Sequence, residues 1–118
     1  MASPAINDEV LMINAENSNE QILINFDALR RAVLTLRAIN HHLRQEMIKL
    51  LEEEGRMTVT EIYVKLRLEQ SVASQHLAIL RRSGILNTER DGKFIYHSIS
   101  KNRLKDISIF IEDLINYQ

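Results

Sequence analysis

One face of the segment from Gln70 to Ser83 carries side chains suited to contacting the edges of nucleic-acid bases. These side chains are small or form hydrogen bonds, and they are Ser71, Ser74, Gln75, Ala78 and Arg82. Small side chains let a backbone approach a groove closely, and hydroxyl and amide groups both donate and accept there. The chemistry that this face indicates is recognition rather than catalysis.

Apolar residues on the opposite side of the same segment predict the helix that holds this face. Ala73, Leu77 and Leu80 recur at intervals of four and three residues, which is the spacing of a buried helical stripe. Gly84 is placed to end the helix in a left-handed conformation, and basic residues in the last turn complement the helix dipole.

A second, shorter helix is predicted upstream, from Glu61 to about Leu66. Thr58 and Glu61 have the spacing of a capping box, in which each side chain bonds the other residue's backbone N–H. Residues 67–69 then form a short turn into the Gln70 helix. Two helices joined in this way, the second polar on one face, are typical of a helix-turn-helix.

A β-hairpin is predicted downstream, with strands at residues 85–90 and 93–98 around Asp91-Gly92. Asp-Gly readily adopts the positive φ angles of a tight turn. Arg90 and Lys93 lie on either side of the tip, where cations can contact phosphates. The alternative is that the hairpin only covers the core.

The stretch RMTVTEIYVKLRLEQSVASQHLAILRRSGILNTERDGKFIYHSI resembles the winged helix-turn-helix of the arsenic-repressor (ArsR/SmtB) family of bacterial transcriptional regulators. SVASQHLAILRRSGIL is similar to the family pattern S-x-V-S-x-H-L-x-x-L-x-x-x-G-L-V, and RDGKFIYHSI to its wing, R-x-G-x-x-x-Y-Y. The resemblance implies a mainly α fold with a small β-hairpin wing and long N- and C-terminal helices. It also implies binding to double-stranded DNA.

Composition and charge agree with this interpretation. The 118 residues suit one small domain. The net charge is −1, but the basic and acidic residues are distributed unevenly along the chain. Residues 56–105 hold ten Lys and Arg against four acids, a balance of +6, whereas the remainder has five basic and twelve acidic residues, a balance of −7. A positive segment of this kind indicates nucleic-acid binding. The absence of a membrane-spanning apolar run or a signal-peptide pattern favours a cytoplasmic protein without a membrane partner.

The rest of the chain is predicted to support the helix-turn-helix. Residues 1–17 lack a sustained period and are interpreted as a flexible arm, and residues 18–118 as the winged helix-turn-helix domain. A long helix is expected from about Ser18, with Ser18 and Gln21 as a second capping box. Further helices are expected from His42 to Glu54 and from Asn102 to Asn116.

The two terminal helices carry more apolar surface than one small domain can bury, which predicts a homodimer. The family resemblance implies the same, because these regulators pair through their first and last helices. The residues expected in the dimer interface are Ile22, Phe26, Leu29, Val33, Ile107, Phe110, Ile111 and Leu114. Two recognition helices about one turn of DNA apart predict a palindromic operator.

No metal or cofactor is predicted. The chain has no Cys, and the positions that match the family's C-x-C metal site are Thr58 and Thr60, whose hydroxyls are poor ligands for soft ions. A last-helix zinc site is disfavoured because Ser108 stands where the family has a His. His42 and Glu46, four residues apart, supply at most half of a site.

The sequence therefore predicts a dimeric DNA-binding transcriptional regulator, a repressor rather than an enzyme. Ser71, Ser74 and Gln75 are expected to contact bases. Gln70 and His76 are expected at the start of the helix or at phosphates. Arg90 and Lys93 are the expected contacts of the wing. The alternative is a winged-helix protein-interaction module, which the acid Glu69 at the helix start favours. A metal-responsive enzyme fragment is a third reading, supported only by His42 and Glu46. The effector is unknown.

Overall fold

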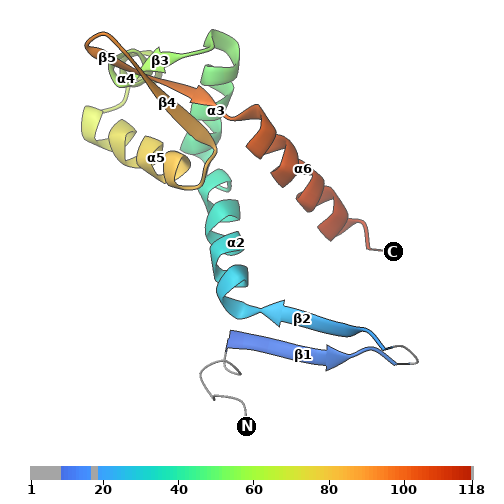
Figure 1. Ribbon diagram of the computed structural model, residues 1–118. Coiled ribbons are helices and arrows are strands. Elements are labelled where there is room, and N and C mark those ends of the chain that lie inside the picture. Colours follow the sequence, from blue (N-terminus) through green and yellow to red (C-terminus); the bar gives the residue numbers. More distant parts are fainter. Residues whose placement is uncertain (1–8, 17–18, 118) are drawn as a thin grey trace. The chain divides into compact units, whose positions relative to one another are not determined.

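The computed structural model describes residues 9–16 and 19–117, and the chain forms two compact units that divide between Arg37 and Ala38 (Figure 1). The first unit holds strand β1 (Val10–Asn14), strand β2 (Gln21–Asn25) and most of helix α2 (Phe26–Ile39). The strands pair antiparallel, from Val10 opposite Asn25 to Asn14 opposite Gln21.

The helix expected from Ser18 begins instead at Phe26, so that prediction was wrong. Gln21 lies in β2 and caps no helix, and Ser18 is outside the described residues. The helix start is at Asn25, whose side-chain Oδ1 accepts a hydrogen bond from the backbone N–H of Ala28 at 3.0 Å. Asn is among the most favoured residues for that role.

A strand also forms within residues 1–17, where we expected a flexible arm. Val10–Asn14 is that strand, whereas residues 1–8 and 17 lie outside the described part of the chain. Arg30 Nη2 of α2 contacts Glu9 Oε2 at 2.7 Å, which ties the start of the hairpin to the helix. The division into an arm and a domain at residue 17 stays a prediction.

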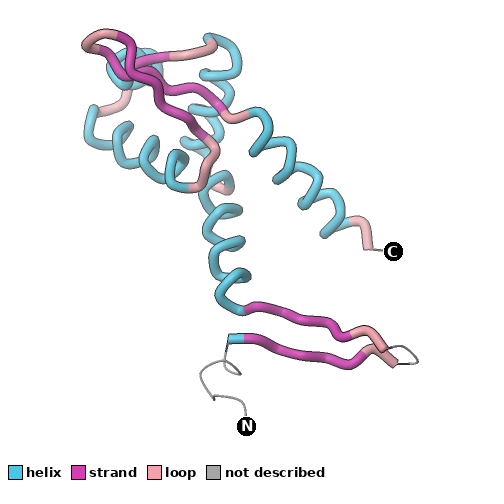
Figure 2. The backbone as a smooth tube through the Cα atoms, in the orientation of Figure 1, coloured by secondary structure: helices cyan, strands magenta, loops and turns pink. Residues whose placement is uncertain are grey.

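The second unit contains the predicted helices, and their bounds lie within two residues of those expected. It comprises α3 (His42–Glu54), β3 (Met57–Thr58), α4 (Val59–Leu66), α5 (Gln70–Arg82), β4 (Leu86–Asp91), β5 (Phe94–Ile99) and α6 (Lys101–Ile115). The fold is mainly α with a small antiparallel sheet, as predicted (Figure 2). The described helices are not long and apolar enough for any of them to cross a membrane.

The sheet of this unit has the order β3-β5-β4, with one more strand than expected. The hairpin turn consists of Gly92 and Lys93, because Asp91 still pairs with Phe94. The prediction of a turn at Asp91-Gly92 was therefore wrong by one residue. Only Gly92 of that dipeptide has a positive φ, at 65°.

The core of the second unit is formed by aliphatic side chains from α3, α4, α5 and the sheet. Met47, Leu51, Ile62, Leu80 and Ile85 are the largest side chains with almost no solvent exposure. They hold α5 by one face against α3 and the sheet, which leaves its other face to solvent.

Candidate nucleic-acid interface

The turn before α5 is fixed by two local features. The capping box at the start of α4 is present as predicted: Glu61 N–H donates to Thr58 Oγ1 at 3.2 Å, and Thr58 N–H donates to Glu61 Oε1 at 2.9 Å. At the other end of α4, Arg67 takes the left-handed conformation with φ 56°, and its N–H bonds the carbonyls of Tyr63 and Val64. This conformation turns the chain within three residues toward α5.

Helix α5 has the two faces that its sequence predicts. Ala73, Leu77 and Leu80 are buried. The polar residues Gln70, Ser71, Ser74 and Gln75 are all exposed and share one surface. Glu69 is the residue before the helix. Its carboxylate accepts no hydrogen bond from the first backbone N–H groups of α5.

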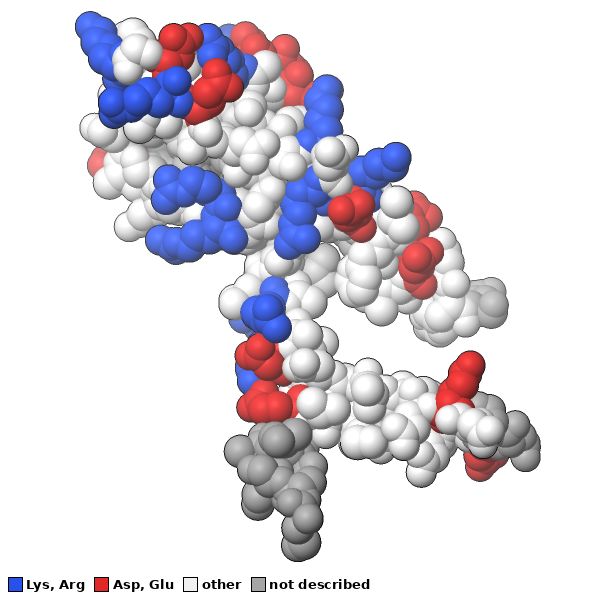
Figure 3. Space-filling view, in the orientation of Figure 1, with Lys and Arg blue, Asp and Glu red and all other residues white. Residues whose placement is uncertain are grey.

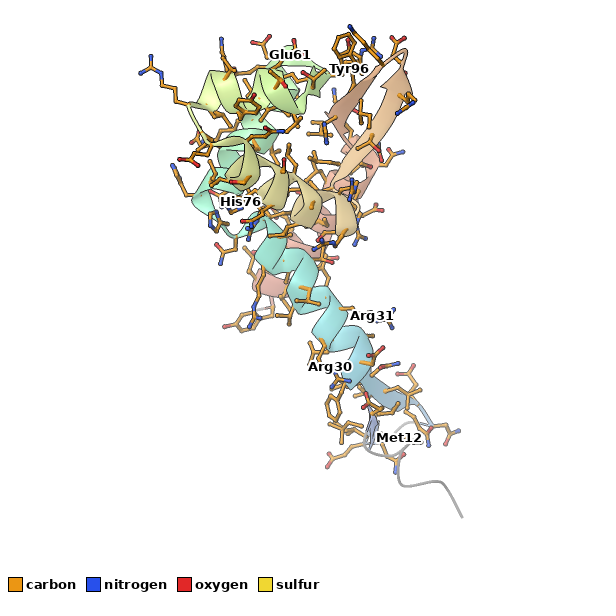
Figure 4. The ribbon with its side chains drawn as sticks, turned by 90° about the vertical axis from the view of Figure 1, so that its left-hand side faces the viewer. Met12, Arg30, Arg31, Glu61, His76 and Tyr96 are labelled. Atoms are coloured by element: carbon orange, nitrogen blue, oxygen red, sulfur yellow. The ribbon has the colours of Figure 1, made fainter. Side chains whose placement is uncertain are left out.

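His76 is placed apart from these four residues. Figure 4 labels His76 on α5. Its Nδ1 lies 3.0 Å from Nη1 of Arg44, and its ring centroid lies 4.8 Å from that of His41. Burial, followed by the charges of His41 and Arg44, lowers the pKa of His76. Arg44 is itself buried and donates from Nε to the carbonyl of Ala38 at 2.6 Å. His76 thus links α5 to α3 as a neutral hydrogen-bond acceptor.

The wing presents both cations that the sequence predicted there. Arg90 on β4 and Lys93 in the turn are exposed, and Lys93 Nζ lies 5.3 Å from the centroid of the Phe94 ring. Two acids, Glu89 and Asp91, flank Arg90 in β4. Left unpaired, they would oppose the approach of a phosphate.

Arg56, which the sequence marked only as one of the ten basic residues of the positive segment, pairs with both acids and offsets one of their two negative charges. Its guanidinium contacts Asp91 at 2.9 Å and Glu89 at 3.4 Å, and lies 4.1 Å above the Tyr96 ring. The hydrogen bond to Asp91 is the largest cause of the raised pKa of Arg56. A signal was present in the sequence: Glu89 and Asp91 are two residues apart on one strand face, where their like charges repel and a cation beside both is favourable.

A groove of about 810 Å³ joins the recognition helix to the wing. Ser74 and Arg81 of α5 line one side, and Lys93 and Tyr96 line the other. Figure 3 shows Lys and Arg side chains gathered over the β4–β5 hairpin and α5. Hydrogen-bonding side chains and cations therefore share one hollowed surface, which is what a nucleic-acid groove and its phosphates require.

The positions weighed as metal ligands and set aside in the sequence have other roles here. Among residues 9–16 and 19–117, no group of three or more His, Asp or Glu side chains is placed to hold a metal ion. His42 Nε2 lies 3.7 Å from Glu46 Oε1, as a pair within one helix. Thr58, at a C-x-C position of the family, uses its hydroxyl in the capping box.

The residues expected at a dimer interface have different environments. On α6, Phe110, Ile111 and Leu114 are exposed, whereas Ile107 is only 7% exposed and belongs to the core. Leu29 of α2 is exposed, and Phe26 and Val33 are half-buried. Ile22 is exposed but lies on β2, so its assignment to a helical stripe was wrong.

Comparisons with known proteins agree with this geometry. The model of the bacterial regulatory protein family arsR matches residues 41–88, from the residue before α3 into β4. The transcriptional activator HlyU of Vibrio cholerae is 33% identical over 75 residues, which cover 64% of this chain and 68% of HlyU. The chain belongs to the ArsR family of bacterial regulatory proteins.

Solved structures place this ArsR-family chain among winged helix-turn-helix proteins. The structure of Vibrio cholerae HlyU matches with a TM-score of 0.58 and 30% identity, covering 75% of this chain and 95% of that one. The transcriptional repressor PagR of Bacillus anthracis matches with a TM-score of 0.59 and 29% identity, covering 74% and 99%. A Mycobacterium bovis fragment described as a homodimeric winged helix-turn-helix DNA-binding domain has a TM-score of 0.62 at 19% identity and covers 75% and 81%, which supports the fold.

Family membership gives the chain its general activity. It is a DNA-binding transcriptional regulator, and the prediction that it is not an enzyme is confirmed because the family consists of regulators. The predicted resemblance to the arsenic-repressor family is confirmed as well. With no Cys in the chain, this member lacks the family's cysteine metal site.

Proposed function

We propose that the chain is a homodimeric repressor that binds a palindromic operator in double-stranded DNA, in the cytoplasm where bacterial promoters are. The observation that carries the proposal is the groove that Ser74 and Arg81 of α5 line together with Lys93 of the wing. Gln70, Ser71, Gln75 and Arg90 are exposed outside that lining. Repression follows because a dimer seated on a promoter occludes the DNA beneath it.

Base contacts are assigned to Ser71, Ser74 and Gln75. All three are exposed on the side of α5 opposite its buried stripe, so they can enter a major groove while the helix stays packed. Gln75 has both an amide donor and a carbonyl acceptor, a combination that pairs well with adenine. We assign it the largest share of the sequence preference.

Phosphate contacts are assigned to Gln70, Arg90 and Lys93. Gln70 is the first residue of α5, where helix N–H groups and the helix dipole favour an anion. Arg90 and Lys93 are exposed at the wing beside carboxylates that Arg56 already pairs. His76 is left out of this set because its Nδ1 is engaged with Arg44.

Dimerisation is assigned to exposed apolar residues of the terminal helices, chiefly Leu29, Phe110, Ile111 and Leu114. Exposed aliphatic and aromatic residues clustered along a helix mark an interface rather than a solvated surface. A two-fold axis then sets the two α5 helices about 34 Å apart, so half-sites recur about one helical turn apart.

A binding-site selection from random duplex DNA tests the proposal. Purified protein is used at two salt concentrations, and a palindromic motif with half-sites about one turn apart is the expected result. The mass by light scattering at micromolar concentration should be that of a dimer. A reporter gene placed behind the selected operator should fall in expression when the protein is supplied, whereas a rise would identify an activator.

The second candidate is a winged helix that binds another protein. Glu69 beside the start of α5 favours it, because a carboxylate there opposes a phosphate. Enrichment of no DNA sequence, with only weak and salt-sensitive binding, would support this candidate over the regulator of a defined operator.

A further inference from the structure

The β1–β2 hairpin has one face made entirely of aliphatic side chains. Residues that pair directly across two antiparallel strands point to the same side, and Leu11 pairs with Ile24 while Ile13 pairs with Ile22. These four residues form the aliphatic face. The other side of the hairpin carries Met12 and Leu23 at its centre, with Val10 opposite Asn25 at one end and Asn14 opposite Gln21 at the other.

The aliphatic face is open to solvent within its unit. The exposed fractions are 41% for Leu11, 42% for Ile13, 49% for Ile22 and 37% for Ile24. A two-stranded hairpin alone is marginally stable in water, and continuous exposed apolar surface marks a site of interaction. Something is therefore expected to cover this face.

The composition of the hairpin restricts what that partner is. Neither strand contains a charged or aromatic residue, and the strands are uncharged along their length in Figure 3. Nucleic acid needs Lys and Arg, and a membrane surface favours basic and aromatic side chains. The aliphatic face offers no such group and no hydrogen bond, so its partner is another aliphatic surface.

The connection to α2 identifies which aliphatic surface is available. Strand β2 ends at Asn25 and α2 begins at Phe26, with the Asn25 cap fixing the junction. In any dimer that uses α2, a second hairpin is held nearby at high effective concentration. An identical face is also self-complementary about a two-fold axis.

A stable dimer buries more surface on each chain than the exposed face of α6 provides. A helix of 15 residues is about 22 Å long and 10 Å wide. One face of it covers a few hundred Å², whereas obligate homodimers bury roughly 1,000 Å² or more on each chain. The hairpin and α2 are the described apolar surfaces outside the second unit that extend the interface.

We propose that the aliphatic face of the β1–β2 hairpin packs against the same face of a second copy of this chain. The inference rests on the homodimer proposed above and adds to it a contact outside residues 41–88, the part that the family model matches. The two hairpins form a two-layer β-sandwich between the protomers, with no polar group between the layers.

Site-directed cross-linking of the full chain tests this contact, because the protein has no Cys of its own. Ile22→Cys places a thiol on the aliphatic face, and Leu23→Cys places one on the opposite face. The native side chains at these adjacent positions are 49% and 60% exposed, respectively. A bifunctional maleimide long enough to span the roughly 10 Å between packed sheets joins two thiols that lie on facing layers. We expect Ile22→Cys to give covalent dimers at least about 10 times faster than Leu23→Cys, whose thiols lie outside the sandwich.

The failure of this inference is distinguishable from failure of the proposed function. Both variants are first shown to be dimers that bind the selected operator. If they are, and the two thiols cross-link equally or not at all, the hairpin contact is wrong while the regulator stands. If the unmodified chain is a monomer, both the homodimer and the hairpin contact are refuted.

A second pair of variants measures the contribution of the face. Ile22→Lys inserts a charge into the aliphatic face, and Leu23→Lys inserts the same charge on the opposite face of the hairpin. The dimer dissociation constant should rise at least about 10-fold for Ile22→Lys and change less than about two-fold for Leu23→Lys. Equal effects of the two variants would overturn the proposal.

Discussion

The guanidinium of Arg56 bonds the carboxylate of Asp91 at 2.9 Å, across 35 positions of sequence, and links the residue before β3 to the tip of the wing. Because Glu89 lies against the same guanidinium, one cation contacts both acids of β4 and offsets one of their two negative charges. Arg56, Arg90 and Lys93 together outnumber these two acids, so the wing with Arg56 keeps a net charge of +1 (three cations minus two acids). Arg56, which is not assigned a DNA contact, therefore contributes to the positive charge of the wing.

Arg56→Ala should leave both acids without this cation and weaken binding to all DNA sequences. We expect a loss of about 10-fold at low salt that shrinks as salt screens the carboxylates. Filter binding or fluorescence anisotropy at two salt concentrations measures it. Lys49→Ala, which removes an exposed cation paired with Glu46 on α3, is the matched control. Adding Glu89→Gln and Asp91→Asn should restore affinity, and the absence of rescue would argue against the neutralising role.

Gln75→Ala should reduce sequence discrimination while leaving non-specific affinity nearly unchanged. A side chain that pairs with a base edge contributes about 1–3 kcal/mol of discrimination. The ratio of affinities for the selected operator and a scrambled duplex measures this contribution. An unchanged ratio would assign Gln75 to the solvated surface.

Arg90→Ala should weaken binding equally for operator and scrambled DNA. A lost phosphate contact lowers the slope of log affinity against log salt by about one. Titrations across a salt series give that slope for the parent and the variant. A parent-like slope is incompatible with a phosphate contact by Arg90.

Acid should destabilise the protein through His76. Burial lowers the pKa of His76, so below the ordinary His value of about 6.5 the unfolded chain binds more protons than the folded one. Stability is therefore full above that pH and falls as pH decreases toward the folded pKa. His97, whose pKa burial also lowers, adds a loss of the same sign.

Urea denaturation between pH 5 and 8 measures this dependence. His76→Gln retains an oxygen that can accept from Arg44 but does not titrate. Its stability should vary less with pH than that of the parent. A parent-like pH dependence in His76→Gln would leave the effect to other groups, His97 first.

The second unit could be predicted from sequence because its signals are local. Thr58 and Glu61 cap α4 from three residues apart, and the buried stripe of α5 lies within one helix. Gly84 takes the positive φ that ends this segment. Each signal depends only on near neighbours, so no tertiary contact had to be known.

The first unit could not be predicted because its spacing permits two interpretations. Ile22 and Phe26 are four residues apart, as on a helix, yet Ile22 and Ile24 also alternate as on a strand. The choice depends on Leu11 and Ile13 in the partner strand. The two strands are separated by residues 15–20, and the sequence of either strand alone does not indicate that they pair.

Tertiary contacts also explain the packing of His76 and the hairpin turn that was placed one residue too early. His76 is adjacent in sequence to polar residues, but Arg44 from α3 engages its ring. Asp91 belongs to a good turn dipeptide, but it stays in register opposite Phe94 while its carboxylate bonds Arg56. Both partners are more than thirty residues away.

The left-handed Arg67 limits which residues natural or laboratory variation can place between the two helices. A residue other than Gly, Asn or Asp in that conformation costs about 1 kcal/mol or more, and β-branched residues cost more still. In a library randomised at this codon and selected for repression, Gly and Asn should be enriched, while Val, Ile and Pro should disappear. At position 67 the left-handed backbone conformation, rather than the chemistry of the side chain, thus determines which amino acids are accepted.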